Sequence, residues 1–572
     1  MGDPPLRARA LEVSATAQDQ AGAADRHWSA ALLAGALVLR IAYVFRLPID
    51  SDEPQHLHVA WAWTQGLVPH RDVFDNHAPL FHLLVAPLLA AVGERADVLH
   101  LMRLAMLPLF AVSLAATWAI GRKLWGERAG LWSAVFLALN PWFFFRSLEL
   151  RTDDLWTALW LLALAALLGN APAGRRGLLG GFLLGAALAT SQKTLMLLVA
   201  LAGAAILLPF TAPGPRVSPR APGAARLVVA ALAGLLVVPL AVAALYARES
   251  ALGALLQGAL LHNLLPPAGG AWHLIRPLLF VPALVPIVAG ARWLACRAGR
   301  TGVGPRQAVL VLAAGIYLAL LYTVWPLVNR QDLLPLLPLL VVAVTGVLLT
   351  AARGPAGAVG RALPASGLAL VALLEALALV RGVPLGVDQT REAKALIAET
   401  LALTRRGDHV LDLKGETVFR PRATFWVLER ITKARLARGF LVDRIPEDCV
   451  RVRAAVATAD VTGFPPRTRA FLEENYVPIG RLRVAGRLLP CRAPGDDQPV
   501  EVDVVIPARY ALVARPGGEG ARLDGTPYRG PRFLERGRHA IALAPGSGRA
   551  ALVWAQAVVL GFAPDLAAAP CP

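Results

Sequence analysis

A stretch near the amino terminus gathers side chains that can transfer protons or ligate ions. The segment from Ile49 to His82 contains Asp50, Asp52, Glu53, Asp72, Asp75, His56, His58, His70, His77 and His82. It follows a long apolar run, Trp28 to Leu47, so these groups lie where a membrane span meets water. Titratable groups at such a boundary indicate acid–base chemistry. We interpret residues 48–97 as the catalytic external loop of a membrane enzyme.

Metal binding is the other chemistry open to carboxylates and histidines. No His-x-x-x-His pair has a convincing third ligand beyond Asp52, His56 and His77, so the sequence predicts no metal.

A helix has to position the first carboxylates. Glu53-Pro54 has the form of a helix start, because proline at the first helical position loses no hydrogen bond. Between Pro54 and Gln65 one helical face carries Leu57, Ala60, Trp61 and Thr64. Indole rings favour the membrane interface, so we expect a helix along the membrane surface, with Asp52 and Glu53 at its amino end.

The composition requires a membrane as the main solvent. The chain has 572 residues, 56% of them hydrophobic and only 17% charged, with a mean hydropathy of +0.54. Soluble domains carry about 25% charged residues. The net charge of +18 comes from arginines scattered among apolar runs, which indicates lipid headgroups and argues against nucleic acid as a partner.

About eleven apolar runs are long enough, or nearly so, to span a membrane. They occupy residues 28–47, 98–120, 129–147, 155–169, 178–191, 194–210, 227–246, 273–291, 307–324, 333–352 and 363–381. A further apolar stretch, Pro79 to Val92, is interpreted as re-entrant or interfacial. We therefore expect an α-helical polytopic membrane domain over residues 28–381.

Basic residues predict the orientation of these spans. With residues 1–27 in the cytoplasm, the inner segments carry Arg7, Arg9, Arg26, Arg122, Lys123, Arg128, Arg175, Arg176, Arg216, Arg220, Arg226, Arg292, Arg297, Arg300, Arg306, Arg353 and Arg361. Outer turns carry one or two each, as the positive-inside rule requires. The first 27 residues lack an apolar core followed by a cleavage site, so Trp28 to Leu47 is expected to act as an uncleaved anchor.

The sequence after Arg381 is mixed and polar, and an odd number of spans places it outside. Residues 386–497 predict an α/β domain, and residues 498–572, with short alternating runs between turns, predict a β-sandwich-like segment. A disulfide between Cys449 and Cys491 and two unpaired thiols remain equally open. No catalytic motif is evident there.

Four motifs in order carry a family resemblance. They are Asp52-Glu53 with the helix ending at Gly66 and Asp75-Asn76-His77-Ala78-Pro79-Leu80; Glu149 to Asp154; Ser191-Gln192-Lys193-Thr194; and Asn329 to Pro335. Over residues 28–380 the chain resembles the GT-C glycosyltransferases related to bacterial protein O-mannosyltransferases and aminoarabinose transferases. The predicted topology places all four motifs on the outer side. The resemblance implies a GT-C-like bundle in the inner membrane and a sugar donor carried on polyprenyl phosphate.

The resemblance also implies roles for the acidic residues. Asp52 matches the family's base, whereas the alternative is that Asp52 and Glu53 only cap the helix. Asp153 matches the second acidic position and would orient the acceptor or the sugar, together with Arg151 and Asp75. Asp154 fills that role if the motif shifts by one residue, and the alternative is an Arg151–carboxylate pair that closes a short loop.

Cationic side chains are the candidates for the donor phosphate. Lys193 is flanked by apolar sequence, and the alternative is that it only snorkels to the interface. His77 stands where aminoarabinose transferases carry a lysine, and Ala78 replaces a proline of other relatives, which points away from a strict aminoarabinose transferase. Arg330 matches a basic position but is followed by Gln331 and Asp332, which weakens its assignment.

These residues predict an inverting glycosyltransferase that acts on an external glycan, lipid or protein acceptor. The resemblance does not require a metal for transfer, and the lipid-linked sugar donor is a co-substrate. A multi-span transporter or lipid flippase is the alternative, because ionisable residues within spans also mark transport paths. The sequence shows no second Asp-Glu loop and no inverted repeat of the kind that transporters carry.

The topology can be tested with reporter fusions. Fusions after Gly126 and Pro219 should report the cytoplasm, and fusions after Gly66 and Gly407 the outer side, because basic loops are retained inside. A cytoplasmic reporter at Gly407 would show that the span count is wrong by one.

Overall fold

The computed structural model describes residues 6–211, 222–264, 275–296, 304–325, 328–351, 363–490, 498–515, 520–543, 549–564 and 566. The chain forms two compact units. We call Met1–Pro48, Asn76–Leu84 and His100–Gln389 the helical unit, and Ile49–Asp75, Val85–Leu99 and Thr390–Pro572 the sheet unit. The predicted inner residues Arg216, Arg220, Arg297, Arg300, Arg353 and Arg361 lie outside the described residues, as do Cys491 and Cys571.

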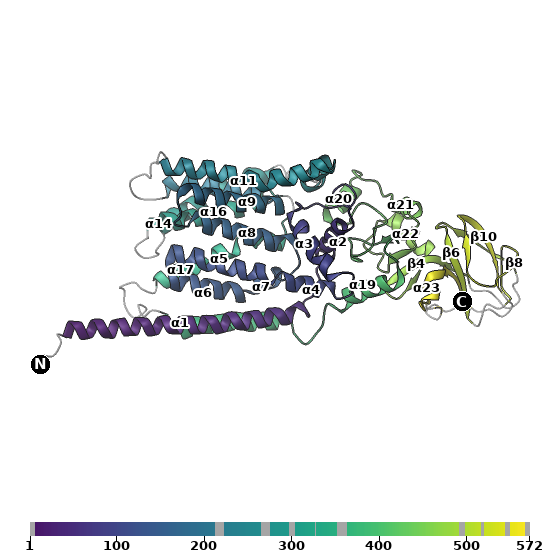
Figure 1. The fold of residues 1–572 in the computed structure, drawn as a ribbon, viewed down its shortest axis with the longest axis horizontal. Helices are drawn as coiled ribbons and strands as arrows, with labels where there is room; N and C mark the ends of the chain where they lie inside the picture. The colour runs from purple at the N-terminus through teal and green to yellow at the C-terminus, as the bar shows by residue number, and fades with distance from the viewer. Residues whose placement is uncertain are drawn as a thin grey trace. The chain divides into compact units, whose positions relative to one another are not determined.

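The helical unit is a bundle in which neighbouring helices pack side by side (Figure 1). It contains α1 (Leu6–Val44), α5 (Leu107–Trp125), α6 (Glu127–Leu139), α7 (Pro141–Arg146), α8 (Thr152–Leu167), α9 (Ala173–Thr190), α10 (Thr194–Leu207), η1 (Leu208–Phe210), α11 (Pro222–Arg248), α12 (Leu252–Leu255), η2 (Leu256–Leu261), η3 (Arg276–Leu279), α14 (Phe280–Cys296), α16 (Pro305–Thr323), η4 (Arg330–Leu333), α17 (Leu337–Ala351) and α18 (Ala365–Gly382). Two further helices, α3 (Leu80–Val92) and α4 (Val98–Ala105), contribute residues to both units.

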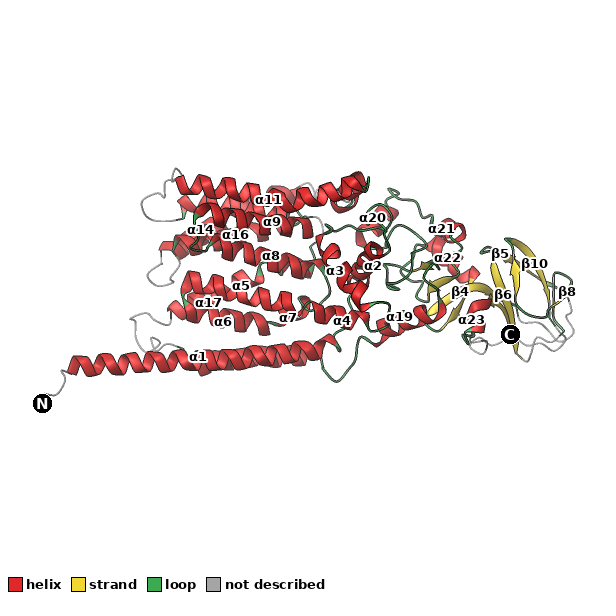
Figure 2. Cartoon of the chain, viewed as in Figure 1, coloured by secondary structure: helices red, strands yellow, loops and turns green. Residues whose placement is uncertain are grey.

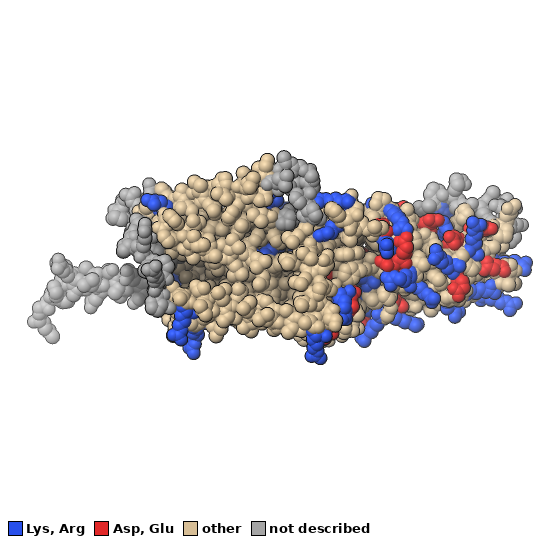
Figure 3. Space-filling model, turned by 90° about the horizontal axis from the view of Figure 1, so that it is seen from above, with Lys and Arg blue, Asp and Glu red and all other residues tan. Residues whose placement is uncertain are grey.

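Each predicted apolar run coincides with one or two of these helices. Five described segments are long and apolar enough to cross a membrane, namely Gly22–Val44, Val98–Trp125, Gly223–Arg248, Arg276–Cys296 and Ala365–Gly382, and the remaining apolar helices are shorter. The surface of the bundle is almost free of charged side chains in the view of Figure 3. The expectation of a polytopic α-helical membrane fold is confirmed.

Helices α9 and α11 approach each other closely because one face of α9 consists of glycines. A methyl group added to Gly181 would lie 2.0 Å from the Ala231 carbonyl oxygen, and one added to Gly185 would lie 2.3 Å from that of Leu235. In lipid, where apolar burial gives no drive for association, such small residues let helix backbones pack directly.

The sheet unit begins with α2 (Asp52–Thr64) and holds all the named strands of the described chain, drawn in yellow in Figure 2. Its helices after residue 390 are α19 (Arg391–Leu403), α20 (Arg430–Ala437), α21 (Ile445–Arg451), α22 (Pro466–Asn475) and α23 (Ala555–Val559). Its strands are β1 (Val410–Leu411), β2 (Val456–Thr458), β3 (Tyr476–Ile479), β4 (Leu482–Leu488), β5 (Val500–Val504), β6 (Ala508–Arg515), β7 (Arg522–Leu523), β8 (Thr526–Pro527), β9 (Arg532–Leu534), β10 (Gly537–Ala542) and β11 (Arg549–Trp554).

These strands form two sheets. The larger has the order β1-β2-β4-β11-β6-β9, with β3 also paired to β4, and the smaller has the order β5-β10-β7-β8. Strands β1 and β2 are parallel, and the other pairs are antiparallel. Apolar side chains of both sheets, such as Ile541 and Leu552, belong to one core.

The predicted boundary at residue 497 needs correction, although a C-terminal sheet region is confirmed. Strand β11 lies between β4 and β6, with Leu552 opposite both Arg487 and Leu512. Residues 386–497 and 498–572 therefore share a sheet and are not two separate domains. The order of strands along a sheet depends on long-range pairing, which local patterns do not encode. Cys449 is buried in the shared core.

The close approach of α9 and α11 gives a stability prediction. Gly181→Ala should lower the melting temperature of the detergent-solubilised protein by about 5 °C, because the methyl group cannot fit without moving a backbone. Gly35→Ala in α1 is the matched control, since a methyl group there meets no atom within 4 Å and should leave the melting temperature unchanged. Equal melting temperatures for both variants would show that the contact contributes little.

Candidate functional site

The Glu149–Asp154 motif forms the turn that enters α8 in the helical unit. Arg151 is the residue before the helix and has extended backbone angles, φ −138° and ψ 159°. Asp153 lies in the first helical turn, where the free N–H groups of the helix favour a negative charge. Both side chains are buried.

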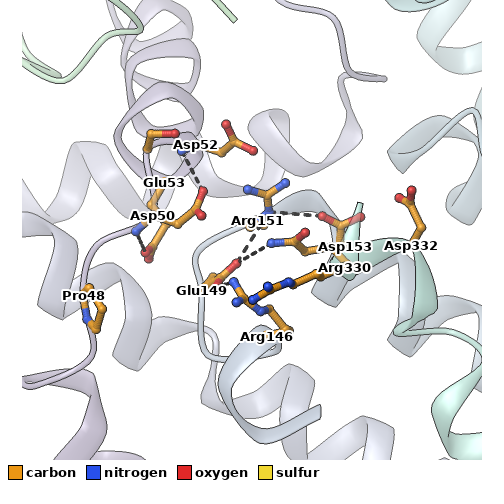
Figure 4. A network of polar contacts seen from close by, with 12 residues as sticks. Pro48, Asp50, Asp52, Glu53, Arg146, Glu149, Arg151, Asp153, Arg330 and Asp332 are labelled. Carbon is orange, nitrogen blue, oxygen red and sulfur yellow. Dashed lines mark hydrogen bonds and ion pairs between the residues drawn. The ribbon is translucent and has the colours of Figure 1, made fainter. Parts of the chain in front are cut away.

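An ionic network starts from this turn (Figure 4). The Arg151 Nε atom lies 3.3 Å from Asp153 Oδ2 and 3.9 Å from Glu149 Oε2. Arg146, in α7, pairs with the other oxygen of Glu149 at 2.6 Å. The predicted Arg151–Asp153 pair is present, but it is one part of a larger cluster and not an isolated loop closure.

Lys193 joins the same cluster from the turn before α10. Its ammonium group forms an ion pair with Asp332 and lies 3.7 Å from Asp153 Oδ1 and 5.8 Å from the ring centroid of Trp156. Only 16% of the Lys193 side chain is exposed. The side chain is engaged within the protein in this structure, unlike a lysine that snorkels toward water.

Asp332 is held in place by its own turn, η4. Its Oδ2 accepts a hydrogen bond from the Asn329 amide at 2.8 Å, and its backbone carbonyl accepts one from the Tyr317 hydroxyl at 2.7 Å. The neighbouring Gln331 donates to Glu149 Oε2 at 3.0 Å. Three motifs that are far apart in the sequence thus meet in one buried cluster.

Asp153 and Asp154 have different surroundings. Asp153 faces Arg151 and Lys193, whereas neither carboxylate oxygen of Asp154 has a hydrogen-bond partner among the described residues. Asp154 instead interacts electrostatically with Arg40, whose guanidinium donates to the Phe144 carbonyl at 2.9 Å. Asp154 lies outside the network of Asp153.

His77 and Arg330 lie at the edge of this cluster. The His77 ring lies 6.4 Å from the His82 ring and near enough to Asp153 to interact with its charge. Arg330 is exposed, its backbone carbonyl accepts a hydrogen bond from Trp142 Nε1 at 3.2 Å, and its side chain forms no ion pair with a described residue. Across the described part of the chain, no group of three or more His, Cys, Asp or Glu residues has a metal-binding arrangement.

The predicted base belongs to the sheet unit and has a different set of contacts. Asp50 Oδ1 accepts the Asp52 amide at 3.0 Å, and Glu53 Oε1 accepts the Asp50 amide at 2.9 Å. Asp50 and Glu53 therefore satisfy the backbone at the start of α2. The Asp52 carboxylate pairs with Lys414, which also donates to Ser51 Oγ at 3.1 Å.

Helix α2 forms at the expected place but is covered by protein. Every residue of α2 from Glu53 to Ala62 is buried, so the helix has no exposed polar face in this region. The reason lies in the chain beyond residue 390: His58 Nδ1 lies 2.9 Å from the Val418 carbonyl, and Gly415 packs directly against His58. Asp75, which lies within the predicted external loop of residues 48–97, is also buried.

Three participants were missed from the sequence: Glu149, Asp332 and Lys414. The first two stand inside recognised motifs and were given no role, because their partners come from other loops. Lys414 precedes Gly415, and a turn glycine was the only local signal.

Comparison with known proteins supports the fold. No model of a protein family matches the chain, and no curated protein matches it. ArnT from Cupriavidus metallidurans in the apo state matches with a TM-score of 0.56 and 15% identity, over 80% of this chain and 98% of ArnT. The form bound to undecaprenyl phosphate matches with the same score, 16% identity and the same coverage.

More distant matches include an oligosaccharyltransferase from Archaeoglobus fulgidus, with a TM-score of 0.41, 14% identity and coverage of 79% of this chain and 73% of that protein. The conclusion about the fold rests on the similarity to ArnT alone. The GT-C fold expected from the motifs is confirmed.

Proposed function

We propose that this protein is an inner-membrane glycosyltransferase that moves a sugar from a polyprenyl phosphate to an acceptor on the external side. The observation that carries the proposal is the convergence of three separate motifs in one buried ionic cluster, in a chain with the fold of ArnT. One solved ArnT structure contains undecaprenyl phosphate. The acceptor class, a glycan, a lipid or a protein side chain, stays open.

The proposed reaction is a single displacement at the anomeric carbon. Asp52 takes the proton of the acceptor nucleophile, whose electron pair forms the new glycosidic bond. The bond between the anomeric carbon and the phosphate oxygen breaks, and its electron pair stays on the phosphate. Attack from the face opposite the leaving group inverts the configuration.

Lys193 is the proposed partner of the departing phosphate, with Arg330 and His77 in supporting positions. In this structure the Lys193 charge is balanced by Asp332 and Asp153. Donor binding is therefore an exchange of partners, in which phosphate oxygens replace a carboxylate at the ammonium group. Asp153 and Arg151, with Asp75, are proposed to orient the sugar or the acceptor.

The predicted topology supports the external location. The basic segments fall on one side and the motif loops on the other, so the positive-inside rule places the motifs outside the cytoplasm. A donor that carries its own leaving phosphate suits a compartment without nucleotides.

The proposal is tested by mass spectrometry of envelope lipids, glycans and proteins from deletion cells complemented with variants. The wild-type gene should restore a hexose or aminosugar modification that the deletion removes. Asp52→Asn should lower it about 100-fold or more, the usual contribution of a positioned base. Glu53→Gln should be milder, because the Gln side-chain oxygen can still accept the Asp50 amide. Unchanged envelopes in the deletion strain would reject the function, and equal, modest effects of both variants would reject Asp52 as the base.

The Lys193–Asp332 pair allows a second test, which separates folding from phosphate binding. Lys193→Met leaves Asp332 buried without its cation, so we expect a destabilisation of about 3–5 kcal/mol together with loss of transfer. The double variant Lys193→Met/Asp332→Asn removes both charges and should recover the melting temperature but not the transfer. Lys193→Arg should recover part of both. Full transfer by the double variant, from synthetic undecaprenyl-phosphate sugars to deletion-strain membranes, would remove Lys193 from the site.

A further inference from the structure

The segment Asp412 to Val418, which we call the 412–418 loop, is a rigid turn of the sheet unit. Asp412 is buried, and its oxygens accept hydrogen bonds from the Gly415 amide at 2.9 Å, the Thr417 amide at 3.1 Å and the Thr417 hydroxyl at 2.8 Å. Arg422 Nε lies 2.7 Å from Asp412 Oδ1. Burial alone would raise the pKa of Asp412, but the Arg422 charge and these hydrogen bonds hold it below its ordinary value.

This loop is clamped onto helix α2. Gly415 has φ +91°, and a methyl group added there would lie 2.9 Å from His58 Cβ, so only glycine allows the contact. Burial lowers the pKa of His58 to about 4, which makes the imidazole neutral at physiological pH. Because the Val418 carbonyl can only accept, the His58 Nδ1 atom must carry the proton in the 2.9 Å hydrogen bond.

The clamp brings Lys414 to the first turn of α2. Its ammonium group bonds to Asp52 Oδ1 and to Ser51 Oγ, and only 15% of the Lys414 side chain and 24% of the Asp52 side chain are exposed. The Lys414 backbone amide donates to Glu416 Oε2 at 2.7 Å, which fixes the base of the side chain. Both the backbone and the head group of Lys414 are therefore positioned.

We propose that Lys414 is a positioning residue for the base, so that the region after residue 390 supplies part of the catalytic machinery. The inference rests on the proposed role of Asp52. A bond from Lys414 to one carboxylate oxygen fixes the plane of the carboxylate, and the ammonium charge favours its ionised form, which is the form that accepts a proton. A lysine on a loop that Asp412 and Arg422 anchor has less conformational freedom than a lysine on an exposed segment. It therefore holds this geometry at a lower entropic cost.

The charge predicts a change in pH dependence that a purely structural residue would not cause. Lys414 contacts the Asp52 carboxylate, Asp50 and Glu53 lie at the same helix start, and Glu416 accepts from the Lys414 amide. Replacing Lys414 by an uncharged residue removes a charge that favours the ionised Asp52 carboxylate. The acid limb of the rate profile should then move to higher pH by about one unit.

Glu416 requires its own control because it accepts from the Lys414 amide and can add its own titration to the rate profile. Burial, and then the charge of Asp412, raises the pKa of Glu416 to about 7. All profiles are therefore measured with Glu416 and again with Glu416→Gln, which removes this second titration.

The experiment uses the full-length protein, synthetic undecaprenyl-phosphate sugars as donors and deletion-strain membranes as acceptor. Lys414→Met should lower turnover about 10-fold and shift the acid limb upward, whereas Lys414→Arg should keep the limb in place and recover part of the rate. Lys394→Met is the matched control, since Lys394 is exposed on α19 and forms no ion pair with a described residue, and its profile should equal that of the wild type. If Lys414→Met does not fold, Lys414→Gln takes its place in the same measurement.

Three outcomes would overturn this inference, and they show whether the proposed function stands. If Asp52→Asn abolishes transfer while Lys414→Met and Lys414→Gln keep the wild-type rate and acid limb, the role of Lys414 is overturned and the glycosyltransferase assignment stands. If Asp52→Asn transfers sugar normally, the assignment of the base fails, and the inference fails with it. A fall in rate with no shift of the acid limb, not rescued by arginine, shows a structural role and also overturns the inference.

Discussion

Charge pairing away from water is the constraint on which the helical unit depends. An isolated ion loses several kcal/mol of hydration when it is buried, and only a close counter-charge with further hydrogen bonds compensates. Arg151, Lys193, Asp153 and Asp332 meet this condition together, because each contacts an oppositely charged group from another part of the chain or of its own turn. Ion pairs and hydrogen bonds thereby connect the ends of α7, α8, α10 and η4.

The same pairing bears on the proposed chemistry. A cation that already has a carboxylate partner gains little from a neutral ligand, but an entering phosphate can take over the carboxylate's position. Asp332 is fixed by the Asn329 amide through its second oxygen, so it keeps a partner when Lys193 turns to a ligand. On the proposed function, the cluster without a donor thus holds the Lys193 ammonium group in a stable ion pair. This arrangement favours a donor that is anionic.

Hydropathy and basic loops were enough to predict the helices, because a lipid environment imposes one simple rule on every span. Each predicted run became a helix, and the motif turns before α8 and α10 came together with η4. The pairs within these turns could not be predicted. Asp332 pairs with Lys193, which lies 139 residues earlier in the sequence. No local pattern specifies a partner so far away along the chain.

The sheet unit shows more clearly where sequence reasoning stops. Helix α20 begins at Arg430, and Arg422 lies outside it and anchors Asp412. Nothing in the sequence of α2 indicates that a segment some 360 positions later covers it, as the His58–Val418 bond shows. A helix that looks amphipathic by itself cannot reveal which partner will cover its polar face.

The segment that covers α2 also explains why the sequence alone could not distinguish a base from a helix cap at Asp52. Acidic residues at a helix start are usually caps, and two of the three here, Asp50 and Glu53, bond to backbone amides in that way. Asp52 is set apart only by its partner, since its carboxylate turns to Lys414. On the proposed function, the carboxylate that pairs with a lysine on an anchored loop is the one assigned to take the acceptor proton.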